Sequence, residues 1–150
     1  MMQCEEVRVV RNDGGRADAG FLGEARDCVT RAIAIATGKP YREVYDAMNE
    51  LAKRERPRKS KRSSSRLGVH RKTYEPYLLS QGWLWTPTMQ VGAGCTVHLR
   101  PDELPGGRLV VAVSRHLTAV IDGVIHDTHD PSRGGTRCVY GYYTQEPTHD

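Results

Sequence analysis

RDCVTRAIAIATG, residues 26–38, is the segment from which the expected fold is built. Alanine favours a helix, and Gly38 is the residue type that most often follows a helix end. Asp27 precedes this helix and is expected to cap it, because its carboxylate can accept hydrogen bonds from the first backbone N–H groups. Cys28 then lies in the first turn, where the helix dipole favours a thiolate. The alternative is that Cys28 is a small buried side chain.

Length and charge limit the class of protein. The chain has 150 residues, enough for one compact domain that we expect to span 1–150, and its net charge of +4 permits an anionic partner. No apolar run approaches the roughly 20 residues that a membrane span needs, and the first residues lack the apolar region of a secretory signal. We therefore expect a cytoplasmic protein, or a virion protein if a phage encodes it, with no membrane partner. Disulfides are then disfavoured for the cysteines, which are Cys4, Cys28, Cys95 and Cys138.

Helices precede most of the strands in the expected order of elements. After an edge strand at 7–10 and the cysteine helix, apolar spacing predicts helices at 40–54 and 73–80. Strands are expected at 83–85, 95–99, 109–113, 116–121, 124–128 and 138–143, followed by a loose tail at 145–150. The fold class is therefore α+β, with N-terminal helices packed on a C-terminal antiparallel sheet of four or five strands.

The segment 53–66 is strongly basic. It contains four serines, a proline and eight basic residues, which are Lys53, Arg54, Arg56, Arg58, Lys59, Lys61, Arg62 and Arg66. This composition predicts a mobile, solvated loop that buries nothing. Clustered Lys and Arg can also neutralise phosphates, so nucleic-acid binding is the alternative, although no aromatic residue is interleaved for base stacking.

The hairpin at Asp122-Gly123 brings chemically useful residues together. A two-residue turn there pairs Ile121 with Val124 and, counting outward, places His116 and Asp127 diagonally on one face of the sheet. A carboxylate beside an imidazole fixes its tautomer and stabilises the imidazolium. If the cysteine helix packs across this face, Cys28 meets His116, and the imidazole activates the thiol.

The same register gives a second chemical interpretation. His129 falls opposite His116, so Cys28, His116 and His129 share a face and form a set that zinc accepts. We rank this metal hypothesis below a reactive Cys28 thiol and below nucleic-acid binding by the segment 53–66, and we expect no cofactor.

The motifs DCVTRAIA (27–34), SRHLTAV (114–120) and DGVIHDT (122–128) together resemble the papain-like cysteine peptidase superfamily, in particular its small microbial and phage members. The resemblance spans roughly 20–145 and implies a papain-like fold. It further implies a thiol hydrolase that cleaves a peptide or isopeptide bond of a polypeptide substrate through an acyl-enzyme on Cys28. By this resemblance His116 is the general base and later the acid, and Asp127 orients it.

One feature departs from the family. Papain-like enzymes carry a glutamine before the cysteine that donates to the oxyanion, whereas residues 21–26 contain no amide side chain. The backbone N–H of Cys28 and, by its chemistry, Asn12 are the candidate donors. The alternative function is an inactive papain-like fold that serves as a binding module, with nucleic acid held by the segment 53–66.

Overall fold

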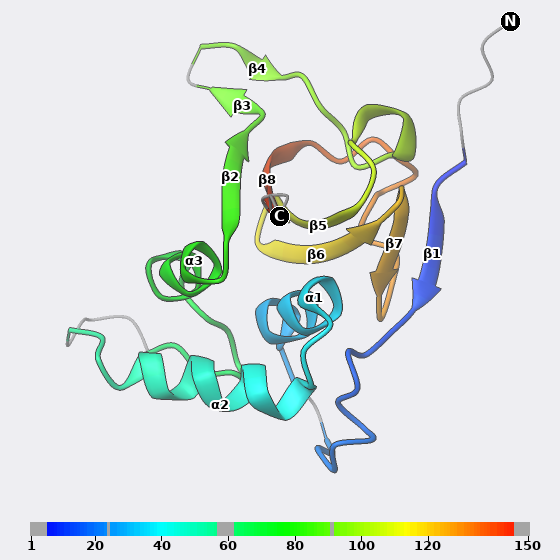
Figure 1. The fold of residues 1–150 in the computed structure, drawn as a ribbon. Coiled ribbons are helices and arrows are strands. Elements are labelled where there is room, and N and C mark those ends of the chain that lie inside the picture. Colours follow the sequence, from blue (N-terminus) through cyan, green and yellow to red (C-terminus); the bar gives the residue numbers. More distant parts are fainter. Residues whose placement is uncertain (1–5, 24, 57–61, 91, 146–150) are drawn as a thin grey trace, which may run out of the picture.

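The computed structural model describes residues 6–23, 25–56, 62–90 and 92–145 (Figure 1). The helices are α1 (Cys28–Thr37), α2 (Tyr41–Ala52) and α3 (Arg71–Ser80), with a short 3-10 helix at Pro101–Glu103. The strands are β1 (Arg8–Arg11), β2 (Trp83–Pro87), β3 (Met89–Gln90), β4 (Gly94–Cys95), β5 (Arg108–Val113), β6 (His116–Ile121), β7 (Val124–Asp127) and β8 (Val139–Gln145). The α+β class and all three expected helices are confirmed, with helix ends within two residues of the prediction.

The main sheet is larger than expected and is not purely antiparallel. It has six strands in the order β1-β7-β6-β5-β8-β2, and β1 runs parallel to β7. The prediction of a four- or five-stranded antiparallel sheet is therefore wrong on both counts. The parallel edge arises because the chain leaves β1 for the helices and returns to the same sheet much later.

The sheet separates two hydrophobic cores. On one side α1 packs against Val110, Leu117 and Ala119, α2 packs on α1, and α3 packs beside β2 (Figure 1). On the other side Val111 and Val120 pack against Leu99 and its neighbours in the segment before β5. The helices therefore cover one face of the sheet, while an irregular segment with the 3-10 helix covers the other.

The sequence correctly predicts how α1 ends at Gly38, but it does not predict how Asp27 is used at the start of the helix. Gly38 ends the helix as expected, with φ of 74° and its N–H bonded to the carbonyl oxygen of Ala34 at 3.0 Å. The capping prediction for Asp27 is wrong, because its side chain makes no cap hydrogen bond. Its carboxylate instead accepts from Arg31 Nη1 at 2.6 Å and Tyr41 Oη at 2.7 Å. Two strong side-chain donors thus replace the backbone donors.

The hairpin between β6 and β7 follows the expected register. Ile121 pairs with Val124, and the turn residues Asp122 and Gly123 have φ of 49° and 81°, as a type I′ turn requires. This part of the sheet was predictable because turn chemistry alone fixes the pairing.

The expected strand at 95–99 is wrong. Cys95 ends the short β4, and His98 forms only an isolated bridge with Cys138. That bridge brings residue 138 beside the β3–β4 hairpin, and Cys95 and Cys138 form a disulfide with Cα atoms 5.8 Å apart. The expectation that disulfides are disfavoured is therefore wrong for this pair. Cys28 is a free thiol, and Cys4 lies outside the described residues.

The basic segment 53–66 is not the fully solvated loop that its composition predicts. Ser63 and Ser65 are buried, and the N–H of Ser65 donates to Asn49 Oδ1 at 2.9 Å. The hydroxyl of Ser65 also donates to the carbonyl oxygen of Tyr45. Serine hydroxyls and backbone groups can therefore anchor an otherwise polar segment under α2. Residues 57–61, which include Arg58, Lys59 and Lys61, lie outside the described part of the chain.

The structure also bears on two other predictions, the absence of a membrane span and the loose tail at 145–150. Within the described ranges, no helix combines the length and apolarity needed to cross a membrane. Gln145 is the last residue of β8 and pairs with Trp83, so the loose tail does not begin at 145. Residues 146–150 lie outside the described part.

Candidate active site

The three candidate catalytic residues meet at one end of the sheet, where β6 begins and β7 ends. Cys28 is the first residue of α1, and its sulfur interacts with the His116 imidazole and the backbone N–H of Leu117. The other side of the imidazole is bound to Asp127, with Nε2 2.7 Å from Oδ2. Nδ1 is therefore the ring nitrogen left for the thiol.

The route by which Cys28 reaches His116 differs from the expected one. Leu117 and Ala119 face α1, so Thr118, which alternates with them, belongs to the opposite face together with Asp127. The helix therefore does not pack across the face that carries the acid. Contact is made instead because His116 is the first residue of β6, and its ring meets the N-terminus of α1 at the end of the sheet.

Asp127 is held by several donors and is 1% exposed. Its Oδ2 accepts from Thr118 Oγ1 at 2.7 Å as well as from His116. Its Oδ1 accepts from Arg31 Nη2 at 2.9 Å and from the N–H of Thr128 at 2.7 Å. These bonds fix the carboxylate rigidly, so the imidazole that it binds is fixed as well.

The pKa values of the three groups are shifted in the directions that activate a thiol. Burial raises the pKa of Cys28, but the hydrogen bonds from His116 and the N–H of Leu117 outweigh it, so the net pKa is lowered. Burial lowers the pKa of His116, but Asp127 and Cys28 outweigh it and raise the pKa to about 9. The pKa of Asp127 is lowered, because the bonds from His116 and Thr118 outweigh its burial. The shifts of Cys28 and His116 both move this pair toward a thiolate beside an imidazolium.

Arg31 supports the site from behind and was missed by sequence reasoning. It is buried and bridges two aspartates, with Nη1 on Asp27 and Nη2 on Asp127. Tyr41 binds the remaining oxygen of Asp27, and burial, together with this bond, raises the pKa of the tyrosine. The available signal was an arginine one turn from Asp27 on an otherwise apolar helix, which requires a buried acidic partner.

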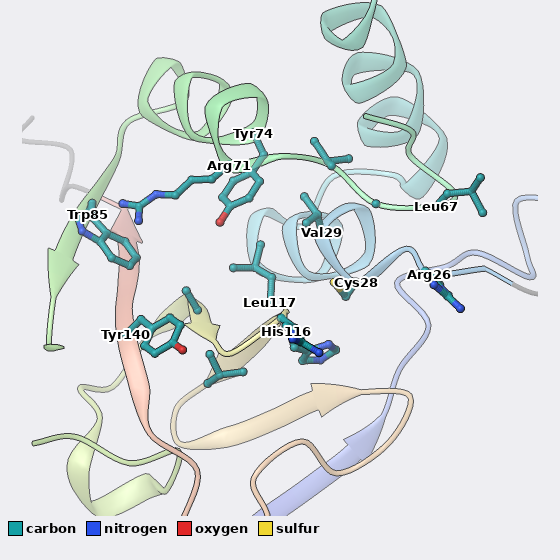
Figure 2. A pocket seen from close by; sticks show the side chains of 15 residues that line it. Arg26, Cys28, Val29, Leu67, Arg71, Tyr74, Trp85, His116, Leu117 and Tyr140 are labelled. Carbon is teal, nitrogen blue, oxygen red and sulfur yellow. The ribbon is translucent and has the colours of Figure 1, made fainter. Parts of the chain in front are cut away.

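Two pockets open beside Cys28 and His116. The larger, of about 450 Å³, lies toward α3 and β2, and its lining includes Leu67, Trp85 and Tyr140 (Figure 2). The second, of about 340 Å³, lies toward Thr128 and His129. Arg26 and Arg115 line both pockets together with the Cys28–His116 pair. The thiol therefore stands at the junction of two hollows and is reachable from both.

The structure does not bring Asn12 to the sulfur. Its amide lies 3.3 Å from His126 Nδ1 and accepts from the N–H of Gly14 at 2.8 Å. It does not line either of the pockets beside Cys28. The prediction of Asn12 as an oxyanion donor is therefore wrong, because its side chain is used to hold the turn after β1.

Most described residues of the basic segment lie away from the thiol. Lys53, Arg54, Arg56, Arg62 and Arg66 are exposed and do not line the two pockets at the thiol. Of these, Arg66 lies nearest the site, because its carbonyl oxygen accepts from the N–H of Arg26 at 2.7 Å.

His116, Asp127 and His129 have potential ligand atoms within 4.8 Å of one another, whereas Cys28 is not part of that group. Because Cys28 lies outside this group, the expected Cys28–His116–His129 metal set is not supported by this geometry.

Comparisons with known proteins do not assign the chain to a family. A scan against protein-family models, a search of curated proteins and a search of solved structures each found no match.

Proposed function

We propose that this protein is a papain-like thiol hydrolase that cleaves a peptide or isopeptide bond through an acyl-enzyme on Cys28. The observation that carries the proposal is the continuous chain Cys28–His116–Asp127 at the junction of two pockets. A buried interaction chain of this kind is costly to build for stability alone, and shifted pKa values at a cleft favour a catalytic role.

The reaction follows from the protonation states. The Cys28 thiolate adds to the substrate carbonyl carbon, and the His116 imidazolium gives its proton to the leaving amine as the C–N bond breaks. Neutral His116 then takes a proton from water, whose oxygen attacks the thioester carbon. The C–S bond breaks, the carboxylic acid is released, and the Cys28 thiolate beside the His116 imidazolium is restored. Asp127 stays ionised throughout and stabilises the imidazolium.

The oxyanion would be stabilised at the N-terminus of α1. Backbone N–H groups in the first turn of a helix have no helical acceptor, and the Asp27 carboxylate does not use them. The N–H of Cys28 is therefore the first candidate donor. A helix end also favours the negative charge that develops there.

The shape of the cleft supports a polymeric substrate. One pocket lies on each side of the thiol, as expected if chain segments on both sides of the scissile bond are bound. Leu67, Trp85 and Tyr140 give the larger pocket an apolar lining for a side chain on one side of the bond. A polypeptide fits this arrangement better than a small amide.

The direct test is the rate at which iodoacetamide alkylates Cys28 at pH 7, with peptide mass spectrometry to assign the site. We expect Cys28 to react at least tenfold faster than glutathione, because a free thiol is mostly protonated at this pH. His116→Gln should reduce the rate to that of an ordinary thiol. The matched control is His129→Gln, since its ring lies 5.1 Å from that of His116 without bonding the sulfur.

Two results would overturn the hydrolase proposal. One is a wild-type rate no faster than that of glutathione, and the other is equal rates in the wild-type protein and in His116→Gln. Circular dichroism of each variant would show that the fold is retained.

Nucleic-acid binding remains the second candidate because Arg54, Arg56 and Arg62 are exposed, and the N–H of Ser63 donates to Glu55 Oε1 at 2.8 Å, which brings the two ends of the basic segment together. If the protein binds nucleic acid through these arginines, its affinity for a single-stranded oligonucleotide falls steeply with salt and is lost when the three arginines are replaced by glutamine. A weak interaction with no salt dependence would remove this candidate and leave the thiol proposal untouched.

A further inference from the structure

A second group of side chains with reactive chemistry lies away from Cys28, beside the β3–β4 hairpin. The sulfurs of Cys95 and Cys138 and the Nε2 of His98 all lie within 4.8 Å of one another. Cys95 Sγ is 3.4 Å from His98 Nε2. Two thiols and an imidazole on one small surface form a set that zinc binds.

The backbone places His98 and Cys138 firmly. They face each other in an antiparallel bridge, and hydrogen bonds join the flanking residues on both sides. The N–H of Leu99 donates to the carbonyl oxygen of Arg137 at 2.9 Å, and the N–H of Val139 donates to that of Val97 at 2.8 Å. Both flanking apolar residues, Leu99 and Val139, are fully buried. The positions of these two ligands therefore do not depend on the disulfide.

His98 is also oriented as a metal-binding histidine. Its Nδ1 lies 3.2 Å from Glu103 Oε1, and the other oxygen of Glu103 lies 3.4 Å from Arg100 Nε. A carboxylate on the far nitrogen fixes the tautomer in which Nε2 is free to coordinate, and this is the usual arrangement behind a zinc-bound histidine. A surface histidine that served only to pack would not need this support.

The distances are close to those of a tetrahedral zinc site. Bond lengths of about 2.3 Å to sulfur and about 2.0–2.1 Å to nitrogen place a sulfur and a nitrogen about 3.6 Å apart, and two sulfurs about 3.8 Å apart. The Cys95–His98 separation of 3.4 Å is already near this value. The two sulfurs must separate from their bonded distance, and breaking the disulfide allows this.

We propose that Cys95, His98 and Cys138 form a redox-controlled zinc site. In the oxidised protein the sulfurs form the disulfide and the site cannot bind metal. A dithiol reductant supplies two electrons and two protons, cleaves the S–S bond and is itself oxidised to a disulfide. Zn²⁺ then replaces the two thiol protons and is bound by both sulfurs and His98 Nε2, with water in the fourth position.

The test uses the full-length protein and Co²⁺ as a spectroscopic probe, followed by displacement with Zn²⁺. After reduction under anaerobic conditions, with loss of the disulfide checked by mass spectrometry, we expect one equivalent of Co²⁺ with the intense absorption of a thiolate-bound tetrahedral ion. Zn²⁺ should displace it, and the oxidised protein should bind neither metal tightly.

Variants identify the ligands. Cys138→Ser and His98→Ala should abolish the thiolate-bound spectrum, and Glu103→Gln should weaken metal binding roughly 10–100-fold while leaving the ligands in place. Cys28→Ser and His129→Gln are the matched controls, because they alter the other cysteine and histidine cluster, and both should still bind one equivalent. Circular dichroism would check that each variant is folded.

Two outcomes would overturn the zinc site. One is reduced wild-type protein that gives no thiolate-bound Co²⁺ spectrum. The other is a spectrum that survives in both Cys138→Ser and His98→Ala. Neither result depends on whether Cys28 is catalytic, because the residues and the measurement are different.

Discussion

Replacement of Asp127 by asparagine tests the electrostatic basis of the site most directly. The change removes a negative charge from beside His116 but keeps a side chain of similar shape that can still accept hydrogen bonds from Arg31 and Thr128. Burial lowers the pKa of His116, and Asp127 is the largest of the influences that raise it to about 9. Without the charge, burial is opposed only by the weaker influence of Cys28, and the pKa should fall well below 9.

The magnitude follows from the size of this shift. A pKa of about 9 instead of 6.5 means that the folded protein favours protonated His116 by about 3 kcal/mol. Because the folded-state pKa is raised, this stability is fully present below pH 6.5 and is lost as the pH rises through about 9. The lowered pKa of Cys28 acts in the opposite direction, so Cys28→Ser is the background in which His116 can be measured alone.

The assay is an NMR titration of the imidazole C–H signals, with urea unfolding at several pH values. In the Cys28→Ser background, we expect Asp127→Asn to lower the His116 pKa by more than one unit and to remove most of the stability change between pH 6.5 and 9. His129→Gln, which keeps Asp127 bound to His116, should change the His116 pKa much less. An unchanged pKa in Asp127→Asn would refute the assignment of Asp127 as the partner that holds the imidazolium.

Two further predictions concern stability. Arg31→Met leaves two buried carboxylates without their shared cation, and urea unfolding should show a loss of about 3–5 kcal/mol. The exposed pair of Lys53 with Glu50 is the control, since Lys53→Met should cost less than about 1 kcal/mol, and equal costs would contradict the role of Arg31. Gly141→Ala places a Cβ 2.4 Å from two Trp85 ring carbons, so β2 and β8 must separate. We expect a loss of about 1–3 kcal/mol and a change in tryptophan fluorescence, whereas an unchanged spectrum and stability would show that the strands yield freely.

The sequence alone determined the parts of the site that depend on local chemistry. Alanine content and a terminal glycine place Cys28 at the start of a helix, and the Asp122-Gly123 turn sets the register that brings His116 beside Asp127. These interactions depend on backbone propensities and on residues near one another in the chain. They were predictable because few conformations satisfy them.

Tertiary structure decided what depends on distant partners. The sequence could not show that β1 joins the sheet in parallel, because that contact depends on how the helices return the chain to the sheet. Nor could it show that α1 covers the face opposite Asp127, so that Cys28 meets His116 only at the end of the sheet. Asp27 likewise accepts hydrogen bonds from Arg31 and Tyr41 and not from the helix N-terminus, because a buried carboxylate binds most strongly to the charged and hydroxyl donors that folding brings near it.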